Sequence, residues 1–288
     1  MKTTSLPETV NNWIDGVETA AADGSLFDKR SPASGELLCR AARSRAADVA
    51  KAVEAAQRAY PAWAGMTPVQ RGDILMAVVR AMQRERQALA AIVAAETGMA
   101  PNAALGETGG AIAQGEFMAG EGRRLYGRTT TSAVPNKYAM TVRQPLGVAG
   151  LIIAANTPIA NVAWKVFPAL ICGNTAVLKA AEDTPATAWF FGKLAHEAGL
   201  PAGVLNIVQG LGEEAGAPLV AHREVAVVSF TGSSEVGRQI AEIAGRRLAK
   251  VSLELGGKNP LVVCDDADLE HAARWVLLSA FSNAGQRC

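Results

Sequence analysis

Apolar residues recur with a helical period along one long stretch of the chain. From Ala46 to Arg124 the sequence is rich in alanine, and its apolar positions repeat every three or four residues. Turn signals interrupt the pattern at Thr67-Pro68 and again at residues 98–101. Three or four helices are therefore expected here, and their residues indicate no particular chemistry.

A different pattern begins after Gln144, where short apolar runs alternate with helical stretches. This alternation is typical of βα units, and near-continuous apolar runs suit a parallel sheet that helices cover on both faces. The expected fold class is therefore α/β. The expected strands are Val148–Ile153, Ala176–Leu178, Val204–Val208, Val225–Phe230, Val251–Leu255 and Leu261–Val263.

Helix starts between these strands are marked by a threonine followed by a proline. Thr157-Pro158 and Thr184-Pro185 each place an N-cap residue before a proline at the first helical position. The second of these helices is expected to end at Gly199, with Pro201 just beyond it. Residues 127–144, which are rich in Thr and contain one Pro, are expected to be extended.

The composition allows a large core and gives no strong electrostatic field. Of 288 residues 49% are hydrophobic and 19% are charged, and the formal net charge is +1. This balance indicates no attraction for nucleic acid or for an anionic membrane, so a small ligand is the expected partner. The polar N-terminus has no signal-peptide core, and polar residues and prolines interrupt the longest apolar region, Leu146–Cys172. The chain is therefore expected in the cytoplasm.

The cysteines follow neither a metal-binding nor a disulfide pattern. Cys39, Cys172, Cys264 and Cys288 are widely scattered along the chain. Reduced thiols are expected, one of them a possible nucleophile, and no metal site is expected.

A glycine turn joins a strand to a helix within Val225–Arg238. The apolar run ends in Phe-Thr-Gly-Ser-Ser, and the helix is expected to begin near Ser233 or Ser234. Backbone N–H groups at such a start, with the helix dipole and a serine hydroxyl, suit a pyrophosphate. The alternative is that Gly and Ser form only a turn and a cap, and the GxGxxG dinucleotide fingerprint is absent.

Two further segments carry groups with reactive chemistry. Leu253–Pro260 places the Glu254 carboxylate in an apolar run, where it is either paired or of raised pKa, and a raised pKa would suit a general base. The alternative is a charge on an exposed strand edge. Phe281–Cys288 ends on a cysteine beside Arg287, which favours a thiolate nucleophile, whereas a lone cysteine is usually a small buried hydrophobe.

Together these segments resemble the signatures of the aldehyde dehydrogenase superfamily. LELGGKNP is similar to the family's glutamate signature and FSNAGQRC to its cysteine signature, in the family's order and spacing. The resemblance extends over essentially the whole chain, including Trp164-Lys165 and Pro168–Asn174. It implies a Rossmann-like parallel sheet and an NAD(P)-dependent oxidation of an aldehyde to a carboxylic acid, through a cysteine thiohemiacetal and a thioester.

By this resemblance three residues have catalytic roles. Cys288 corresponds to the nucleophile that adds to the aldehyde carbon, and Glu254 to the general base that activates water against the thioester. Asn156 corresponds to the side-chain donor that stabilises the developing oxyanion. Its neighbours Ala155 and Thr157 depart from the family, where aromatic residues are common on both sides, so coenzyme packing and substrate fit are expected to differ.

The resemblance also assigns residues that hold the coenzyme. Lys179 and Glu182 correspond to the pair that binds the adenine ribose hydroxyls, and Ser233 corresponds to a pyrophosphate contact. Glu182 favours NAD over NADP, because a carboxylate repels a 2′-phosphate. Glycines are expected where the backbone closely approaches the coenzyme. Further expected contacts are Gly210, Gly212, Phe230, Thr231, Gly232 and Leu255.

The resemblance implies that the chain is a C-terminally truncated member of the family, because members continue beyond the cysteine for about the size of a further domain. The expected divisions are 1–126, the helical N-terminal part of the coenzyme-binding domain; 127–143, the start of an oligomerisation arm; 144–255, the Rossmann-like NAD-binding core; and 256–288, the start of the catalytic domain. The full-length parent is expected to be a homo-oligomer that acts on a small-molecule aldehyde.

Two other functions are weighed against this one. The chain by itself is expected to be an inactive fragment, and one alternative is a non-catalytic nucleotide-binding or interaction module left by truncation. Another is a phosphate-releasing reductase of acyl phosphates. The Glu254 signature argues against that reaction, because it needs no hydrolytic base.

Overall fold

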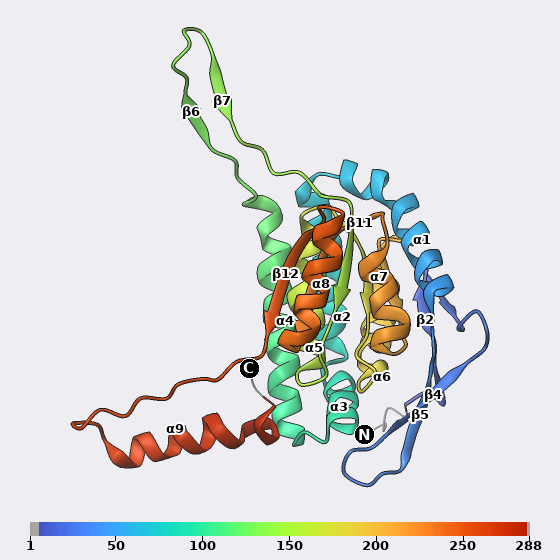
Figure 1. Cartoon of the computed structure of the whole chain (residues 1–288), viewed down its shortest axis with the longest axis vertical. Coiled ribbons are helices and arrows are strands. Elements are labelled where there is room, and N and C mark those ends of the chain that lie inside the picture. The colour runs from blue at the N-terminus through green and yellow to red at the C-terminus, as the bar shows by residue number, and fades with distance from the viewer. Residues whose placement is uncertain (1–5, 287–288) are drawn as a thin grey trace.

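Five parallel strands form most of the largest sheet in the computed structural model, which describes residues 6–286 (Figure 1). Antiparallel β2 (Asn12–Ile14) and β3 (Val17–Thr19) extend the sheet at one side. The α/β class is confirmed, as are five of the six strands expected from the apolar runs. In spatial order the parallel strands are β12 (Lys250–Leu255), β11 (Val225–Gly232), β8 (Val148–Ile152), β9 (Thr175–Lys179) and β10 (Leu205–Val208).

The sixth expected strand, Leu261–Val263, is wrong. These residues belong to no helix or strand, and Val262 is 82% exposed. They follow Gly256-Gly257 on a segment that leaves the sheet, so no strand of the described chain lies beside them to pair with. Three apolar residues do not hold a strand without such pairing.

The expectation of a helical part throughout residues 1–126 is wrong for residues 9–42, which form strands. β1 (Thr9–Val10), β5 (Leu37–Ala42) and β4 (Leu26–Arg30) pair into a small second sheet, while β2 and β3 join the large one. Asp15 and Gly16 form the tight turn between β2 and β3, with φ values of 54° and 78°. The strands are too short for their apolar alternation to stand out in the sequence.

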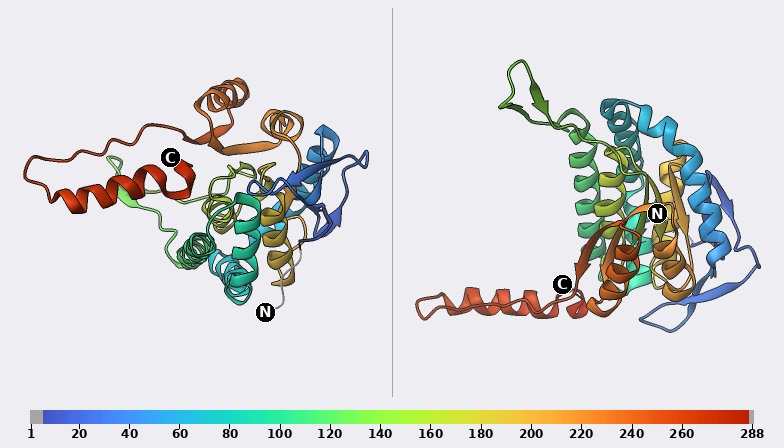
Figure 2. Two further views of the ribbon diagram at one scale, coloured as in Figure 1. Left: turned by 90° about the horizontal axis from the view of Figure 1, so that it is seen from below. Right: turned by 45° about the horizontal axis from the view of Figure 1, so that its top comes forward.

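Helices cover both faces of the parallel core (Figure 2). Along β8, Val148 and Ile152 belong to one core and Ala149 and Leu151 to the other, as expected for a strand buried on both sides. The helical period of residues 46–124 is confirmed as four helices, α1 to α4. One face is covered by α1 (Ala46–Gly65), α7 (Ala217–Ala221) and α8 (Ser234–Arg246). The other face is covered by α5 (Pro158–Ile171) and α6 (Pro185–Glu197). Outside α5 and α6 pack α2 (Pro68–Arg84), α3 (Arg86–Thr97) and α4 (Pro101–Gly120).

Helix α5 begins where its Thr-Pro signal predicts, but its cap comes from another helix. Thr157 occupies the N-cap position, and its side chain makes no capping hydrogen bond. Glu107 of α4 instead accepts hydrogen bonds from the backbone N–H groups of Ile159 at 3.0 Å and Ala160 at 3.1 Å. These N–H groups have no partner within the helix, so the carboxylate satisfies them and lies at the positive end of the helix dipole.

Helix α6 is capped in the same way by Glu96 of α3. Thr184 is the N-cap residue and again makes no side-chain cap. Glu96 accepts hydrogen bonds from the backbone N–H groups of Ala186 at 2.7 Å and Thr187 at 2.8 Å, and from the Thr187 hydroxyl at 2.7 Å. Two acidic residues of the outer helices therefore fix the starts of the helices that follow β8 and β9. The helix ends as expected, with Gly199 at a φ of 91°.

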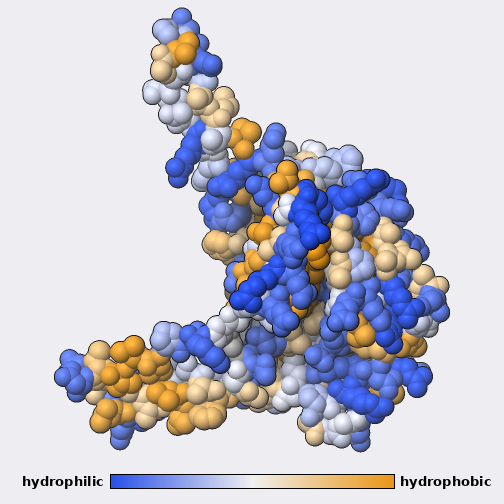
Figure 3. All heavy atoms as spheres, in the orientation of Figure 1, coloured by the Kyte–Doolittle hydropathy of each residue, from blue (hydrophilic) through white to orange (hydrophobic). Residues whose placement is uncertain are grey.

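Two segments project from the body (Figure 1). The hairpin of β6 (Thr129–Thr131) and β7 (Tyr138–Met140) confirms the extended conformation expected for residues 127–144. In the other projection, α9 (Leu269–Phe281) has no buried residue and displays an apolar surface (Figure 3).

No helix of the described chain has the length and apolar character needed to cross a membrane. The single-turn helices are η1 (Glu121–Arg123), η2 (Gly212–Gly216) and η3 (Ser282–Gly285).

The Glu96 cap predicts a pH dependence of stability. Burial raises the pKa of Glu96 to about 7 from an ordinary 4.5, against the hydrogen bonds from Thr187 and Ala186, which lower it. The folded state then holds a proton that the unfolded chain releases near pH 4.5, so this contribution is fully present below that pH and is lost as the pH rises through 7. The loss amounts to roughly 3 kcal/mol, since one pKa unit corresponds to about 1.4 kcal/mol.

Urea unfolding of the wild type and of Glu96→Gln between about pH 5 and pH 8 measures this slope. We expect the wild type to lose stability relative to the variant as the pH rises. Parallel pH profiles for the two proteins would show that Glu96 does not titrate as described.

Candidate active site

The residues singled out in the sequence gather at the edge where the parallel strands end. Lys179 is the last residue of β9 and pairs with Ile152, the last residue of β8. On the other side of β8, Phe230 pairs with Ile152, and one residue further on Thr231 of β11 pairs with Glu254 of β12. Because parallel strands in register end at one edge, the loops that follow them meet there, where parallel α/β sheets bind their ligands.

Lys179 and Glu182 form an ion pair in the loop after β9. The Lys179 ammonium lies 2.5 Å from a carboxylate oxygen of Glu182, and the two side chains are 3% and 44% exposed. Burial acts to raise the pKa of Glu182, but the charge and hydrogen bond of Lys179, with the backbone amides of Glu182 and Gly212, outweigh it and lower that pKa. The pair therefore presents an ionised carboxylate to solvent above a buried ammonium.

The turn after β10 contains the glycines at positions 210 and 212. Gly210 has a φ of 128°, a conformation that side chains disfavour. A Cβ atom there would lie 2.9 Å from the carbonyl oxygen of Ser44, so the close approach that requires glycine is to the protein's own backbone. Gly212 begins η2, and its backbone amide faces the Glu182 carboxylate. The turn thus borders the Lys179–Glu182 pair.

Ser233 is the N-cap of α8, as the sequence predicts. Its side-chain oxygen accepts a hydrogen bond from the backbone N–H of Val236 at 3.2 Å, and the residue is exposed. Its hydroxyl hydrogen remains able to donate. In contrast to α5 and α6, no carboxylate from another helix of the described chain hydrogen-bonds to the first turn of α8.

The other residues expected to contact a coenzyme have unequal surroundings. Phe230 is buried, and its ring lies so close to Gly232 that an added Cβ would come within 2.4 Å of it. Leu255 is partly exposed and packs on Gly237 of α8. Thr231 lines a cavity at the strand ends. Phe230 thus packs in the core, whereas Thr231 and Leu255 are open to a ligand.

Asn156 contacts the segment that leads to Cys288. Its side-chain amide donates a hydrogen bond to the backbone carbonyl of Gln286 at 2.9 Å, and the Asn283 side chain donates to the Asn156 carbonyl at 2.8 Å. Cys288 lies outside the described residues. The structure therefore brings the chain two positions before Cys288 onto the expected oxyanion donor.

A cavity of about 500 Å³ connects Asn156 with Glu254, and its lining includes Trp164, Lys165 and Ser229. The Lys165 ammonium is buried and donates a hydrogen bond to the Ser229 hydroxyl at 2.9 Å. Burial lowers the pKa of Lys165 to about 8, against the charge of Glu254, which raises it. An amide, a carboxylate and a readily deprotonated amine therefore share one cavity.

Glu254 is exposed, although the apolar run around it predicts either a paired carboxylate or one of raised pKa. It lies on the edge strand β12 and forms no ion pair with another of residues 6–286. Along β12 Leu253 packs against the core on one face, whereas Ser252 and Glu254 point to the other face, where they line the cavity. The sequence left open the alternative that Glu254 is a charge on an exposed strand edge. This alternative is the setting that the structure shows.

Two residues of the site, Asn161 and Lys165, are not among those assigned a role from the sequence. Asn161 is buried, and its side chain donates to the Thr157 backbone carbonyl at 3.0 Å and hydroxyl at 3.1 Å, which braces the loop that carries Asn156. Lys165 is the other. A single lysine within the apolar stretch 158–171 is a signal for it, because a buried charge requires a partner or a function.

The sheet order and the site at the strand ends define a doubly wound α/β protein with a candidate active site at the carboxyl edge. Residues 19–288 match the model of the aldehyde dehydrogenase family. The chain belongs to this family. The membership inferred from the glutamate and cysteine signatures is thereby confirmed.

Individual relatives agree in sequence and in structure. The chain is 41% identical to aldehyde dehydrogenase 1A1 of Gallus gallus over 286 residues, which cover 96% of the chain and 54% of that protein. It is 41% identical to the α-ketoglutaric semialdehyde dehydrogenase of Bacillus subtilis, covering 97% and 58%. The chain spans about half the length of the curated relatives it matches.

Solved structures show the same fold. An NADP-dependent enzyme of E. coli superposes with a TM-score of 0.95 at 39% identity, covering 97% of this chain and 58% of that one. The NAD+ complex of an aldehyde dehydrogenase from Bacillus cereus superposes with a TM-score of 0.96 at 34% identity, covering 99% and 58%. These superpositions confirm the fold expected from the resemblance.

The surroundings of Lys165 predict an amine that loses its proton near pH 8. Acetic anhydride labelling across pH, with N-acetyl-lysine amide as an internal standard, measures this through the rate of modification of Lys165. We expect a midpoint at about 8, against an ordinary 10.5. Glu254→Gln removes the carboxylate that raises this pKa, so its midpoint should be lower still. A midpoint near 10.5, or one that Glu254→Gln moves upward, would contradict the described cavity.

Proposed function

We propose that the chain carries the coenzyme-binding part and the nucleophile of an enzyme that oxidises an aldehyde to a carboxylic acid with NAD+. One observation carries this proposal. The hydrogen bond from Asn156 to Gln286 brings the segment leading to Cys288 to the cavity that also contains Glu254. Membership of the aldehyde dehydrogenase family supports the same chemistry.

The residues at the carboxyl edge fit a dinucleotide. Ribose hydroxyls would donate to the Glu182 carboxylate, which reaches solvent, while the Lys179 ammonium would hold the same ribose from below. The first turn of α8, to which no carboxylate from another described helix hydrogen-bonds, and the Ser233 hydroxyl would receive a pyrophosphate. When bound, the coenzyme supplies the two-electron oxidant.

The electrostatics of Glu182 favour NAD+ over NADP+. Its carboxyl group has a lowered pKa and is ionised near neutrality, so it repels a phosphate at the 2′ position. The Lys179 ammonium is already engaged by that carboxylate at 2.5 Å. Among the solved relatives one is described as NADP-dependent and another is an NAD+ complex, so the preference proposed here rests on Glu182.

In the proposed reaction the Cys288 sulfur adds to the aldehyde carbon and forms a thiohemiacetal. The developing negative oxygen accepts a hydrogen bond from the Asn156 side-chain amide. Oxidation leaves a thioester on Cys288. Glu254 then takes a proton from a water molecule, which attacks the thioester carbon and releases the carboxylic acid and the free thiol. The hydrolytic role of Glu254 argues against the acyl-phosphate reductase alternative.

We further propose that a polypeptide of these 288 residues alone does not turn over. Its α9 leaves Leu269, Leu277 and Phe281 at 73%, 60% and 71% exposure, so this surface favours aggregation over an ordered pocket. The alternative of a non-catalytic nucleotide-binding module therefore applies to the isolated polypeptide. Three expectations from the sequence remain predictions. They are the domain divisions at residues 127–143, 144–255 and 256–288, a homo-oligomer formed through the β6–β7 hairpin, and a cytoplasmic location.

Substitutions in the full-length protein test the chemistry. Cys288→Ala should abolish NADH formation, because the thiohemiacetal that is oxidised forms on the Cys288 sulfur. Glu254→Gln should leave a burst of NADH followed by a steady state slower by about 10² to 10⁴, because only hydrolysis needs the base. Cys264→Ala, at an exposed cysteine on the same segment of chain, is the matched control and should behave as wild type. Turnover by Cys288→Ala at the wild-type rate would exclude the mechanism.

A further inference from the structure

The segment Arg43–Arg45 lies directly behind the turn at residues 210–216. The buried side chain of Asn12 joins the two, because its carbonyl oxygen accepts hydrogen bonds from the Ser44 hydroxyl at 3.0 Å and from the backbone N–H of Gln209 at 2.8 Å. One residue further on, the backbone of Gly210 closes on that of Ser44. The start of the turn is therefore seated on the end of β5.

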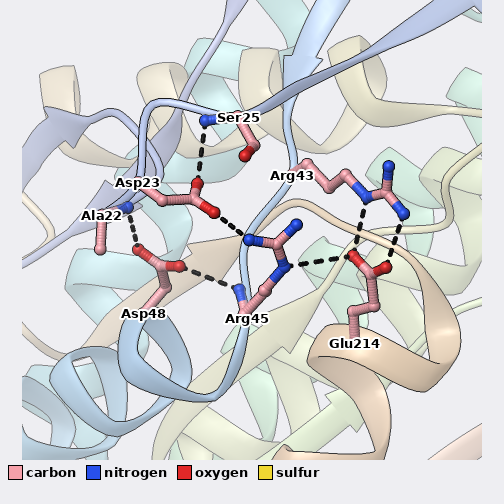
Figure 4. Close-up of polar contacts among 7 residues, drawn as sticks. All are labelled: Ala22, Asp23, Ser25, Arg43, Arg45, Asp48 and Glu214. Atoms are coloured by element: carbon pink, nitrogen blue, oxygen red, sulfur yellow. Dashed lines mark hydrogen bonds and ion pairs between the residues drawn. The ribbon is translucent and has the colours of Figure 1, made fainter.

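Arg43 and Glu214 hold the other end of the same turn (Figure 4). The Nη2 and Nε atoms of Arg43 lie 2.6 Å and 2.8 Å from the two carboxylate oxygens of Glu214, which makes the pair bidentate. Arg45 adds a longer contact to that carboxylate at 3.8 Å. The pKa of Glu214 is lowered, chiefly by the hydrogen bond from Arg43.

The arginines are themselves fixed on the N-terminal side (Figure 4). Arg45 pairs with Asp23, and its backbone N–H donates to Asp48 at 2.9 Å. The other oxygen of Asp48 accepts from the backbone N–H of Ala22 at 2.8 Å. The loop before β4, the end of β5 and the start of α1 therefore form one frame behind the turn.

We propose that the Arg43–Glu214 pair positions the adenosine end of the coenzyme site, an inference that rests on the proposed function. Gly212 lies between the two anchored points of the turn, at Gly210 and Glu214. Its backbone amide faces the Glu182 carboxylate and helps to lower the pKa of that group. By fixing the turn, Arg43 keeps this amide beside the carboxylate that receives the ribose hydroxyls.

If the pair served stability alone, its loss would lower the unfolding temperature; a positioning role predicts weaker coenzyme binding instead. The two side chains are 37% and 27% exposed, and ion pairs in such surroundings contribute little to folding. Loss of the pair should therefore loosen the turn without unfolding the protein. The reacting groups are at Asn156 and Glu254, so loosening the turn should weaken coenzyme binding and leave kcat at saturating NAD+ unchanged.

The test compares Arg43→Met, Glu214→Gln and the double variant in the full-length protein. Each single change should raise the dissociation constant for NAD+ by about threefold to tenfold, and the double variant should be no worse than either single variant, because both remove one interaction. Arg43→Lys keeps the charge without the bidentate geometry and should restore part of the affinity. Thermal unfolding temperatures should match that of the wild type.

Arg58→Met is the matched control, because Arg58 forms an exposed ion pair with Asp15 at 3.1 Å that does not involve the turn. It should bind NAD+ as the wild type does. Wild-type affinity in Arg43→Met, additive losses in the double variant, or an equal loss in Arg58→Met would each overturn the inference.

Lys179→Ala separates this inference from the proposed function. If the wild type binds no NAD+, or if Lys179→Ala binds it as tightly as the wild type, the coenzyme assignment itself fails. If Lys179→Ala weakens binding and Arg43→Met does not, the site stands and the positioning role of Arg43 is wrong.

Discussion

The parallel, in-register pairing of β8 with β9 on one side and β11 on the other is the constraint on which the rest of the structure depends. Because Ile152 pairs with both Lys179 and Phe230, β8 and β9 end at one level of the sheet and β11 ends two residues beyond it. The loops that follow must leave from that edge, so Asn156 and Glu182, which share no sequence neighbourhood, reach the same side of the molecule. A one-residue slip would turn the two buried faces of β8 inside out and destroy both cores.

The helices that start at this edge differ in how their N-terminal N–H groups are satisfied. Glu107 and Glu96 occupy the N-terminal ends of α5 and α6, where they satisfy the N–H groups and offset the dipoles. The first turn of α8 has only the Ser233 cap. The positive dipole end of α8 is therefore less occupied by carboxylates of other helices than the ends of α5 and α6. This difference supports the proposal of a pyrophosphate at α8.

Patterns that are local in sequence predict much of this structure. Short, near-continuous apolar runs identify the five parallel strands, and the Thr-Pro signals locate the starts of α5 and α6. The short strands of residues 9–42 are harder to predict from the sequence, although the Asp15-Gly16 pair is a recognised hairpin signal. The caps by Glu96 and Glu107, and the pair of Arg43 with Glu214, join residues 52 to 171 positions apart, and no local pattern encodes them. The exposure of Glu254 likewise depends on the cavity that its side chain faces, which residues distant in sequence, of α5 and β11, line as well.

In the proposed function a dinucleotide binds across the carboxyl ends of the parallel strands, with its adenosine end between Glu182 and the turn at 210–216. Hydrogen–deuterium exchange of the full-length protein with and without NAD+ tests it most directly. The account predicts slower exchange in residues 210–216 and in the first turn of α8. It predicts no change at the opposite edge, where a cavity of about 470 Å³ is lined by Gly147, Glu224 and Arg247. Protection of that opposite edge, with none at 210–216, would contradict the account.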